Sequence, residues 1–442
     1  MNLRASLLNF VRPKSIVLVF AVAFSATAHT GFAGQIMRDK PNQIDSIVWS
    51  EQQKVSGSDA GASQGVPAVL VYSDHAFVCD PAATVGTNAH QGAVYVFAKS
   101  GTTWVQTQKL VASDGAAFDQ FGNAIAYDPI GGGLVIGSSN KKIGTHTQQG
   151  AVYTFSSLSG TWFQTQELVA TDGVQGDQFG FSVGVSNQAV FVGAPSKMKN
   201  TIPGVGAAYV FQGAAGSRTQ TQQLWGDATS SEGFGWSIAL NGNTTFIGAP
   251  EYYDGNNDVG AVFVFTLQPC VGGGSCWKQQ QLIVAPSCCG QTIDPDSLFG
   301  LSLATSGTTL LVSQPYASFG GWANRYEGAA DIYNLSGGTW TFAQQLTASD
   351  RQVNDLFGYG VALSGTVALV GAVHNLSPGV VYSFEQSGGL WSQQQEFSAS
   401  DGTTHDQFGS AISISGTTAL IGANLADVGG NTDQGAAYFF TH

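Results

Sequence analysis

Short apolar runs alternate with polar and Gly-rich turns along the chain after residue 48. Residues 170–224 show the pattern most clearly. After an acidic turn, one run opens behind Phe179-Gly180, a second ends on Gly193-Ala194-Pro195, a third begins at Gly206, and a Gln-rich run follows. Apolar runs of this length, bounded by turn residues, predict β-strands. The segment therefore predicts a unit of four strands.

This unit recurs along the chain with a period of roughly 50 to 70 residues, which is typical of repeat architectures. The Gly that begins the third run occurs seven times, at Gly92, Gly150, Gly206, Gly260, Gly328, Gly379 and Gly435. A Phe-Gly pair opens six of the units, at Phe121, Phe179, Phe234, Phe299, Phe357 and Phe408. The first unit carries Val66-Pro67 instead. Seven four-stranded units predict an all-β fold, a seven-bladed β-propeller of antiparallel blades.

The pairing of Phe-Gly with Gly-Ala-Pro at 179–195, and again at 234–250, resembles the FG-GAP repeat. That repeat builds the propellers of integrin α-subunits and of related bacterial secreted proteins. The resemblance covers nearly all of the chain after residue 48, and it implies the propeller fold. It implies no particular function, because one fold hosts many unrelated sites.

The beginning of the chain has the features of a secretory signal peptide. Basic residues precede an apolar core at 16–23, and Ala26-Thr27-Ala28 offers a cleavage site. We expect a signal peptide at 1–28, a lead-in segment at 29–48 and the propeller at 49–442. The apolar core is too short for a membrane-spanning helix. We therefore expect a protein without a membrane span that is exported to the periplasm or secreted.

The two ends of the repeat region are complementary. Residues 49–55 match residues 391–397, the fourth run of the sixth unit, whereas the last unit stops at Phe440 after its third run. We therefore expect residues 49–55 to complete the last blade and close the ring. Such closure leaves no unpaired blade edge.

Acidic residues outnumber basic residues, and the formal net charge of the chain is −13. This balance argues against nucleic acid and anionic membrane surfaces as partners. The links between units carry recurring acidic pairs: Asp114 and Asp119, Asp172 and Asp177, Asp227 and Glu232, Asp294 and Asp296, Asp350 and Asp355, and Asp401 and Asp406. The first residue of each pair could accept backbone N–H bonds in its turn, or the pairs could form a cation site or a surface for a basic partner. Recurrence in every link favours the structural role.

Calcium is the cofactor that the resemblance suggests, because integrin blades often hold it between the Phe-Gly strand and the Gly-Ala-Pro strand. Here the corresponding links read VSNQ at 185–188 and LNGN at 240–243, without the alternating oxygen ligands that calcium needs. We therefore expect no cofactor. Weaker calcium candidates occur in the links between second and third strands: Asp254, Asn256 and Asp258, and Asp427, Asn431 and Asp433.

Tryptophan occurs both inside and outside the repeat pattern. One repeat position, at the start of the fourth strand, holds Trp104, Trp162, Trp277, Trp340 and Trp391. A recurring Trp there is expected to pack between neighbouring blades. The candidates for ligand contact fall outside that position: Trp225, Trp236 and Trp322, together with Tyr252, Tyr253, Asp254 and Asp258 in one of the longer links.

Four of the five cysteines lie close together in sequence. Cys270 and Cys276 bracket a Gly-rich turn, and a disulfide between them is plausible in an exported protein. Cys288 and Cys289 could form a vicinal bridge, and exchange among the four stays open. No His stands at a zinc-ligand spacing from them. Cys79 replaces the Gly of a Gly-Ala-Pro landmark and is expected to be a buried free thiol.

One catalytic pattern, G-x-S-x-G at 180–184, falls along a repeat strand, whereas the nucleophile elbow needs a strand-to-helix turn. We therefore expect a secreted, non-enzymatic binding or adhesion propeller that presents an acidic loop face to an extracellular protein, glycan or cell-surface partner. One alternative is a secreted enzyme that acts on polysaccharide with carboxylates of the same face. Another is a structural module of the cell envelope.

Overall fold

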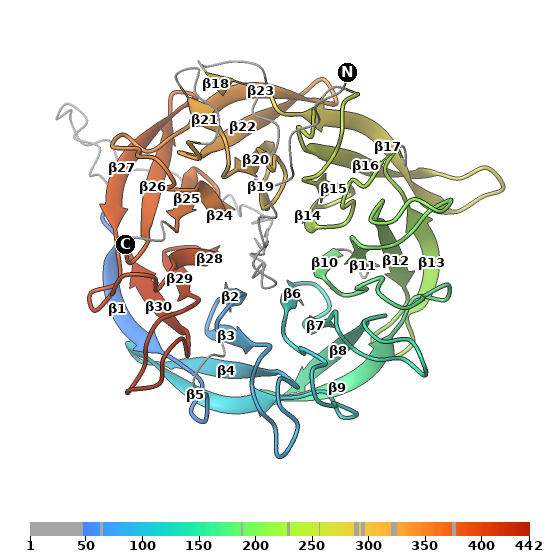
Figure 1. Cartoon of the computed structure of the whole chain (residues 1–442), viewed down its shortest axis with the longest axis horizontal. Coiled ribbons are helices and arrows are strands. Elements are labelled where there is room, and N and C mark those ends of the chain that lie inside the picture. Colours follow the sequence, from blue (N-terminus) through green and yellow to red (C-terminus); the bar gives the residue numbers. More distant parts are fainter. Residues whose placement is uncertain are drawn as a thin grey trace, which may run out of the picture.

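Seven four-stranded antiparallel sheets form a closed ring (Figure 1). The computed structural model describes residues 47–61, 65–186, 189–227, 230–255, 257–286, 291–292, 297–319, 325–373 and 377–442. The expected signal peptide and residues 29–46 of the lead-in lie outside them. No helix occurs among the described residues, so none of them forms a helix that could cross a membrane. The seven-bladed β-propeller predicted from the repeat is confirmed.

In each blade the first strand lies nearest the central axis (Figure 1). Blades 1 to 3 are β2 (Val69–Tyr72), β3 (His75–Asp80), β4 (Ala93–Ser100) and β5 (Thr103–Leu110); β6 (Ala124–Asp128), β7 (Gly133–Ser138), β8 (Ala151–Leu158) and β9 (Thr161–Leu168); and β10 (Ser182–Ser186), β11 (Ala189–Ala194), β12 (Ala207–Gln212) and β13 (Thr219–Leu224). Blades 4 and 5 are β14 (Ser237–Asn241), β15 (Thr244–Ala249), β16 (Ala261–Pro269) and β17 (Ser275–Val284); and β19 (Leu303–Ser306), β20 (Thr309–Gln314), β22 (Ala329–Ser336) and β23 (Thr339–Leu346). Blades 6 and 7 are β24 (Phe357–Ser364), β25 (Val367–Ala372), β26 (Val380–Ser387) and β27 (Leu390–Phe397); and β28 (Phe408–Ser415), β29 (Thr418–Ala423), β30 (Ala436–Thr441) and β1 (Ser50–Val55). A small two-stranded sheet joins β18 (Gln291–Thr292) to β21 (Ser318–Phe319).

The ring closes through the N-terminal strand. Strand β1 pairs antiparallel with β30, with Ser50 opposite Thr441 and Val55 opposite Ala437. The first described strand thus supplies the fourth strand of the last blade, as the match between residues 49–55 and 391–397 predicted.

Seven glutamine side chains tie each outer strand to the next. Each amide bonds one residue at the start of the neighbouring outer strand, either the residue just before the strand or its second or third residue. The amide donates to the backbone carbonyl of that residue and accepts from its backbone N–H, at 2.6–2.9 Å. The pairs are Gln53 with Trp104, Gln108 with Trp162, Gln166 with Arg218, Gln222 with Trp277, Gln281 with Trp340, Gln344 with Trp391, and Gln395 with Trp49. These bonds explain why the fourth strands are rich in Gln.

The recurring Trp side chains pack between blades, as predicted. Trp277 of blade 4 meets Phe191 of blade 3 edge-on, with ring centroids 4.8 Å apart. Trp104 of blade 1 stacks on Phe439 of blade 7 at 4.3 Å. Arg218 takes this position in blade 3 and is also buried.

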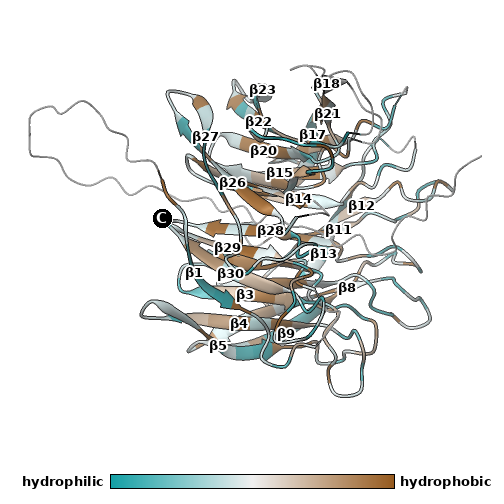
Figure 2. Cartoon of the chain, turned by 60° about the vertical axis from the view of Figure 1, so that its left-hand side comes forward, coloured by the Kyte–Doolittle hydropathy of each residue, from teal (hydrophilic) through white to brown (hydrophobic). Residues whose placement is uncertain are grey.

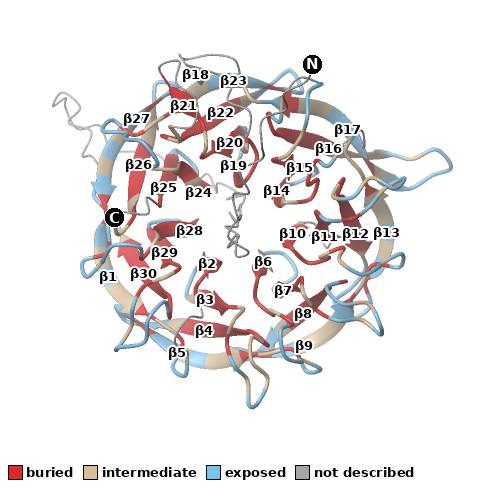
Figure 3. Cartoon of the chain, viewed as in Figure 1, coloured by how far each residue is buried: buried red, intermediate tan, exposed pale blue. Residues whose placement is uncertain are grey.

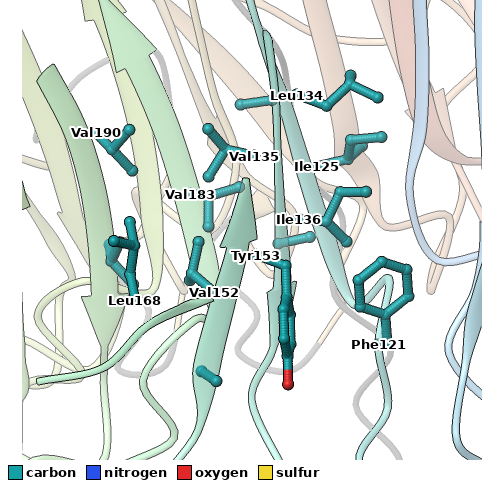
Figure 4. Close-up of a cluster of buried hydrophobic side chains, with 14 of the residues drawn as sticks. Phe121, Ile125, Leu134, Val135, Ile136, Val152, Tyr153, Leu168, Val183 and Val190 are labelled. Carbon is teal, nitrogen blue, oxygen red and sulfur yellow. The ribbon is translucent and has the colours of Figure 1, made fainter. Parts of the chain in front are cut away.

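Aliphatic side chains fill the rest of the space between the sheets. Val135 and Val152 of blade 2 share one buried cluster with Val183 and Val190 of blade 3 (Figure 4). Most residues of the inner strands are buried, on both faces of each strand (Figure 3), so these strands read as nearly continuous apolar runs. The core is therefore a series of interfaces around the ring.

The two sequence landmarks meet at those interfaces. Gly206 has a φ of +82°, and a Cβ there would lie 2.1 Å from the carbonyl oxygen of Phe234 in the next blade. Phe234 is fully buried. Only Gly permits both the positive φ and this close approach, so the repeat keeps a Gly opposite each Phe-Gly.

The cysteine predictions have mixed outcomes. A disulfide joins Cys270 to Cys276 and closes the tip of the β16–β17 hairpin, so the predicted bridge between these two residues is confirmed. Cys288 and Cys289 lie outside the described residues. Cys79 is a buried free thiol in β3, as expected, and burial raises its pKa.

Candidate functional site

The strand order sorts the links onto two faces of the ring. Within an antiparallel blade, the turns between strands one and two and between strands three and four emerge at the same end. The links between strands two and three, and those from blade to blade, emerge at the opposite end. These links are longer (Figure 2). We call this end the long-loop face and the other end the short-turn face.

Five links between second and third strands form projecting hairpins on the long-loop face. Each is closed by an antiparallel bridge: Val428 with Asn431, Val85 with Asn88, Ile143 with His146, Lys199 with Ile202, and Tyr253 with Asp258. They belong to blades 7, 1, 2, 3 and 4, which are consecutive around the ring. We call this set the five-hairpin arc.

The hairpins are held at their bases by backbone and side-chain hydrogen bonds. The N–H of Gly150 donates to the carbonyl of Lys141, and that of Gly206 donates to the carbonyl of Lys197, both at 2.9 Å. In blade 7, the amide of Asn431 donates to Gln434 at 2.8 Å. The backbone polar groups at these bases are thus used within the loops, so the tips project from ordered supports.

The acidic pairs of the blade-to-blade links have structural partners. The first Asp accepts the hydroxyl of a Tyr on the third strand, at 2.8–3.0 Å. These bonds run from Tyr95 to Asp59, Tyr153 to Asp114, Tyr209 to Asp172, Tyr382 to Asp350, and Tyr438 to Asp401. Asp59 was not among the acidic pairs singled out from the sequence. Asp294 and Asp296 lie outside the described residues.

Backbone N–H groups are accepted by the second Asp of a pair as well as by the first. The carboxylate of Asp119 accepts the N–H of Ala116 at 2.7 Å, and that of Asp177 accepts the N–H of Val174 at 2.8 Å. The second Asp stands after the turn, where its side chain folds back on the N–H three residues earlier. Three of the first carboxylates, those of Asp59, Asp114 and Asp401, accept a backbone N–H, as expected, and also accept the Tyr hydroxyl.

Lysines complete this arrangement in four blades. Their ammonium groups lie 2.8–3.3 Å from the first Asp: Lys109 beside Asp59, Lys141 beside Asp114, Lys197 beside Asp172, and Lys54 beside Asp401. Lys141 and Lys197 are buried and also reach the second Asp, at 3.0 and 2.8 Å. Sequence reasoning did not single out these lysines.

The four first carboxylates with a lysine partner have lowered pKa values, which favours their ionised form. Partial burial acts to raise the pKa of Asp114, but hydrogen bonds from Lys141 and Tyr153 outweigh it and hold the pKa below its ordinary value. The pKa of Asp172 is lowered in the same way, with burial opposed by Tyr209 and Lys197. The acidic links therefore fasten loops to blades, and much of their charge is already neutralised.

Blade 4 departs from this pattern, and several candidate residues meet there. Phe263 stands where five other blades have the Tyr, and the hydroxyl of Tyr252 donates to Asp227 instead, at 3.2 Å. Burial and the nearby Asp227 raise the pKa of Tyr252 to about 12. In the adjoining link, the half-buried Trp225 lies under the ammonium of Lys199, 4.6 Å from its ring centroid. Trp225 and Tyr252 thus flank the junction of blades 3 and 4.

The other candidates in this loop lie at its tip. Tyr253 is exposed, as are Asp254 and Asp258. The carboxylate of Asp254 accepts the N–H of Asn257 at 2.9 Å, which closes the turn. Trp236 lies elsewhere, immediately before β14, where it packs edge-on against Phe181 with ring centroids 4.8 Å apart. Trp322 lies outside the described residues.

The calcium candidates are engaged within their own loops. Asp427 accepts the N–H of Asp433 at 2.9 Å, and Asn431 donates to Gln434. Asn256 of the other set is not described. Among the residues that the structure describes, no three His, Cys, Asp or Glu side chains are grouped as they would be around a metal ion.

The G-x-S-x-G segment lies where the repeat puts it. Ser182 begins β10, is fully buried, and donates to the carbonyl of Gly235 in the next blade at 2.6 Å. Its hydroxyl thus joins two blades inside the ring.

The chain matches the family model described as FG-GAP repeat, at residues 104–155, 162–211, 219–265, 340–384 and 391–440. Each match runs from the outer strand of one blade to the third strand of the next, and together they cover more than half of the chain. The fold and these matches define a class of protein, the integrin-like FG-GAP β-propellers. The chain belongs to the FG-GAP repeat family.

Comparison with whole proteins adds little to the family match. A search of curated proteins found no match. Among solved structures, a chain in "Crystal Structure of Mitotic Checkpoint Complex" is similar over 94% of this chain and 99% of that chain, with 10% identity and a TM-score of 0.46.

Proposed function

We propose that this chain is an exported, non-catalytic binding module that holds an extracellular protein or glycan partner on its long-loop face. The observation that carries the proposal is the five-hairpin arc, in which consecutive blades present bridged hairpins on one side of the ring. Rigid scaffolds commonly place their binding residues on such loops. FG-GAP propellers are generally non-catalytic, and the disulfide fits an oxidising, extracellular compartment.

Recognition on this face depends on the hairpin tips more than on the acidic links, since four of the first carboxylates already carry a lysine partner. Exposed carboxylates remain at the two ends of the arc, at Asp254 and Asp258 in blade 4 and at Asp433 in blade 7. The middle of the arc offers exposed Lys142 and half-buried Lys199. The face is therefore acidic at its ends, and its partner is expected to carry basic groups there.

The junction of blades 3 and 4 is the proposed centre of contact. Trp225, Tyr252 and Tyr253 supply amphipathic aromatic surface, and Asp254 and Asp258 supply charge. Aromatic side chains with a polar group are common at binding hot spots because they bury much area at little entropic cost.

The test is a binding screen of the mature chain against glycans and surface proteins, followed by loop replacement. Replacing residues 253–258 with a short Gly-Ser link keeps Tyr252 and its bond to Asp227. We expect binding to weaken at least tenfold while the melting temperature changes little. The matched control replaces Gly388 and Gly389, in the β26–β27 turn of the short-turn face, with two Asn. Retention of full binding after replacement of each of the five hairpins in turn would overturn the proposal, and a screen without any partner would favour a structural role in the cell envelope.

A further inference from the structure

A cavity of about 150 Å³ lies on the short-turn face, between blades 1 and 2. Its floor is formed by the buried rings of Phe77 and Trp162, whose centroids are 5.5 Å apart. Half-buried Tyr72, His75 and Tyr127 form the walls, and exposed Ser157 lies at the rim. A space of this size admits one six-membered ring.

The cavity exists because this junction departs from the repeat. Where Tyr72 ends β2, four other blades have Ser: Ser186, Ser306, Ser364 and Ser415. Several of these hydroxyls tie neighbouring turns together. Ser186 donates to the carbonyl of Gly242 at 3.1 Å, and Ser306 accepts the N–H of Gly365 at 3.0 Å.

Aromatic groups replace that tie at the junction of blades 1 and 2. The ring of Tyr72 lies 4.5 Å from that of Tyr127, centroid to centroid, and His75 occupies a position that is Thr in three other blades. The β6–β7 turn is also longer than the corresponding two-residue turns of the other blades, because it spans residues 129–132. Three departures thus converge on one hollow.

Trp162, which lines the hollow, also carries a buried donor. Within the part of the chain that the structure describes, its indole Nε1–H has no hydrogen-bond partner, and the residue is only 5% exposed. Trp49, Trp277 and Trp391 also leave this group without a partner, so the donor alone does not mark a ligand. At Trp162, however, the residue borders a cavity that a ligand with an acceptor oxygen could enter. An unpaired buried donor gains most from such a ligand.

We propose that this cavity binds one pyranose ring of a neutral glycan. Aromatic walls suit the apolar C–H face of a sugar ring, and the ring hydroxyls or an acetamido carbonyl supply an acceptor for Trp162 and partners for the Tyr hydroxyls. A plain aromatic ring would leave the buried donor unpaired. None of the described residues that line the cavity is Asp, Glu, Lys or Arg, which disfavours charged sugars. The site is on the opposite face from the five-hairpin arc and stands independently of the function proposed above.

Saturation-transfer NMR of the mature chain, with methyl glycosides of neutral hexoses and N-acetylhexosamines, tests this inference. Wild type is expected to bind at least one of them. The double variant Tyr72→Ser/His75→Thr restores the Ser and Thr found in blades 5 and 7, so it should fold and lose the signal. Trp162→Phe keeps an aromatic ring in place and removes one donor, so it should raise the dissociation constant about threefold to tenfold.

The matched control is Trp277→Phe, which removes the same unpaired N–H at the junction of blades 3 and 4. It should bind as wild type does, and so should the chain with residues 253–258 replaced. The inference is overturned if wild type transfers no saturation to any of these glycosides, if the double variant binds them equally well, or if Trp277→Phe weakens binding as much as Trp162→Phe does.

Discussion

Substituting Trp49 by Ala tests whether the N-terminal strand holds the ring closed. Trp49 is 2% exposed and lies between the last two blades. Its ring stacks on Phe397 of blade 6, with centroids 6.3 Å apart, and meets His442 edge-on at 4.5 Å. Its bonds to Gln395 use backbone atoms only and remain available to Ala. The substitution therefore removes packing and leaves the hydrogen bonds in place.

The expected loss follows from the size of the buried side chain. Replacing a buried Trp or Phe by Ala typically costs about 3–5 kcal/mol, because apolar contact is lost and a cavity stays behind. For a cooperative unit of this length, that loss lowers the melting temperature by about 4–6 °C. Strand β1 is joined to the rest of its blade only through β30, so part of the loss should appear as local opening of that edge.

Hydrogen exchange distinguishes local opening of the β1–β30 edge from general destabilisation of the ring. The control is Trp391→Ala, which removes a Trp of similar burial at the junction of blades 5 and 6, inside the continuous part of the ring. We expect both variants to lose similar thermal stability, whereas only Trp49→Ala should speed exchange of the β30 amides that pair with β1. Unchanged melting in Trp49→Ala, or equal exchange of these amides in both variants, would refute closure through this strand.

Three further outcomes are expected. Gly206→Ala should cost about 2–4 kcal/mol in denaturant unfolding because of its close contact with Phe234, whereas Gly86→Ala, with a φ of +61° and nothing within 4 Å, should cost about 1–2 kcal/mol. Burial raises the pKa of Asp80 to about 8, above its unfolded value, so the folded state retains a proton that the unfolded state releases. Stability should therefore fall as pH rises from about 4 to 8, and Asp80→Asn should remove that slope and add up to about 4 kcal/mol at pH 7. Calcium should leave the melting temperature nearly unchanged, and a rise of many degrees that chelator reverses would contradict this.

The fold could be predicted because the same strand and turn landmarks recur in most of the seven units. A single Phe-Gly is weak evidence, but six of them in register with seven Gly positions define the blades. The match between residues 49–55 and 391–397 even gave the partner of β1. The first blade lacks Phe-Gly, and Gly65 and Val66 nevertheless occupy the place next to Gly435 that the Phe takes elsewhere.

The contacts of the candidate site were harder to predict, since they join side chains that are distant in sequence. Asp114 could be assigned to its own turn from local pattern alone, but its Tyr153 partner lies 39 residues away on a neighbouring strand. A signal for this pairing did exist, because Tyr recurs at one position of the third strand in five blades. The sequence analysis did not single out this Tyr. The cavity near Tyr72 was missed for a similar reason, as its walls come from turns of two blades.

In a repeat protein, residues that serve the ring recur, and residues that serve a partner need not. The Gln side chains that bond neighbouring outer strands, the Trp side chains that pack between blades and the Asp–Tyr hydrogen bonds recur in most blades, and each has a structural partner. Two sets of residues instead break the pattern, each in one blade. They are Tyr72 and His75 in blade 1, and Tyr252 and Asp254 in blade 4. Both sets lie next to loops, at positions where the scaffold does not require them. If function maps instead to the recurring Asp ring, substituting Asp172 should abolish binding without lowering stability. Its bonds to Tyr209 and Lys197 predict the opposite, a loss of stability with binding retained.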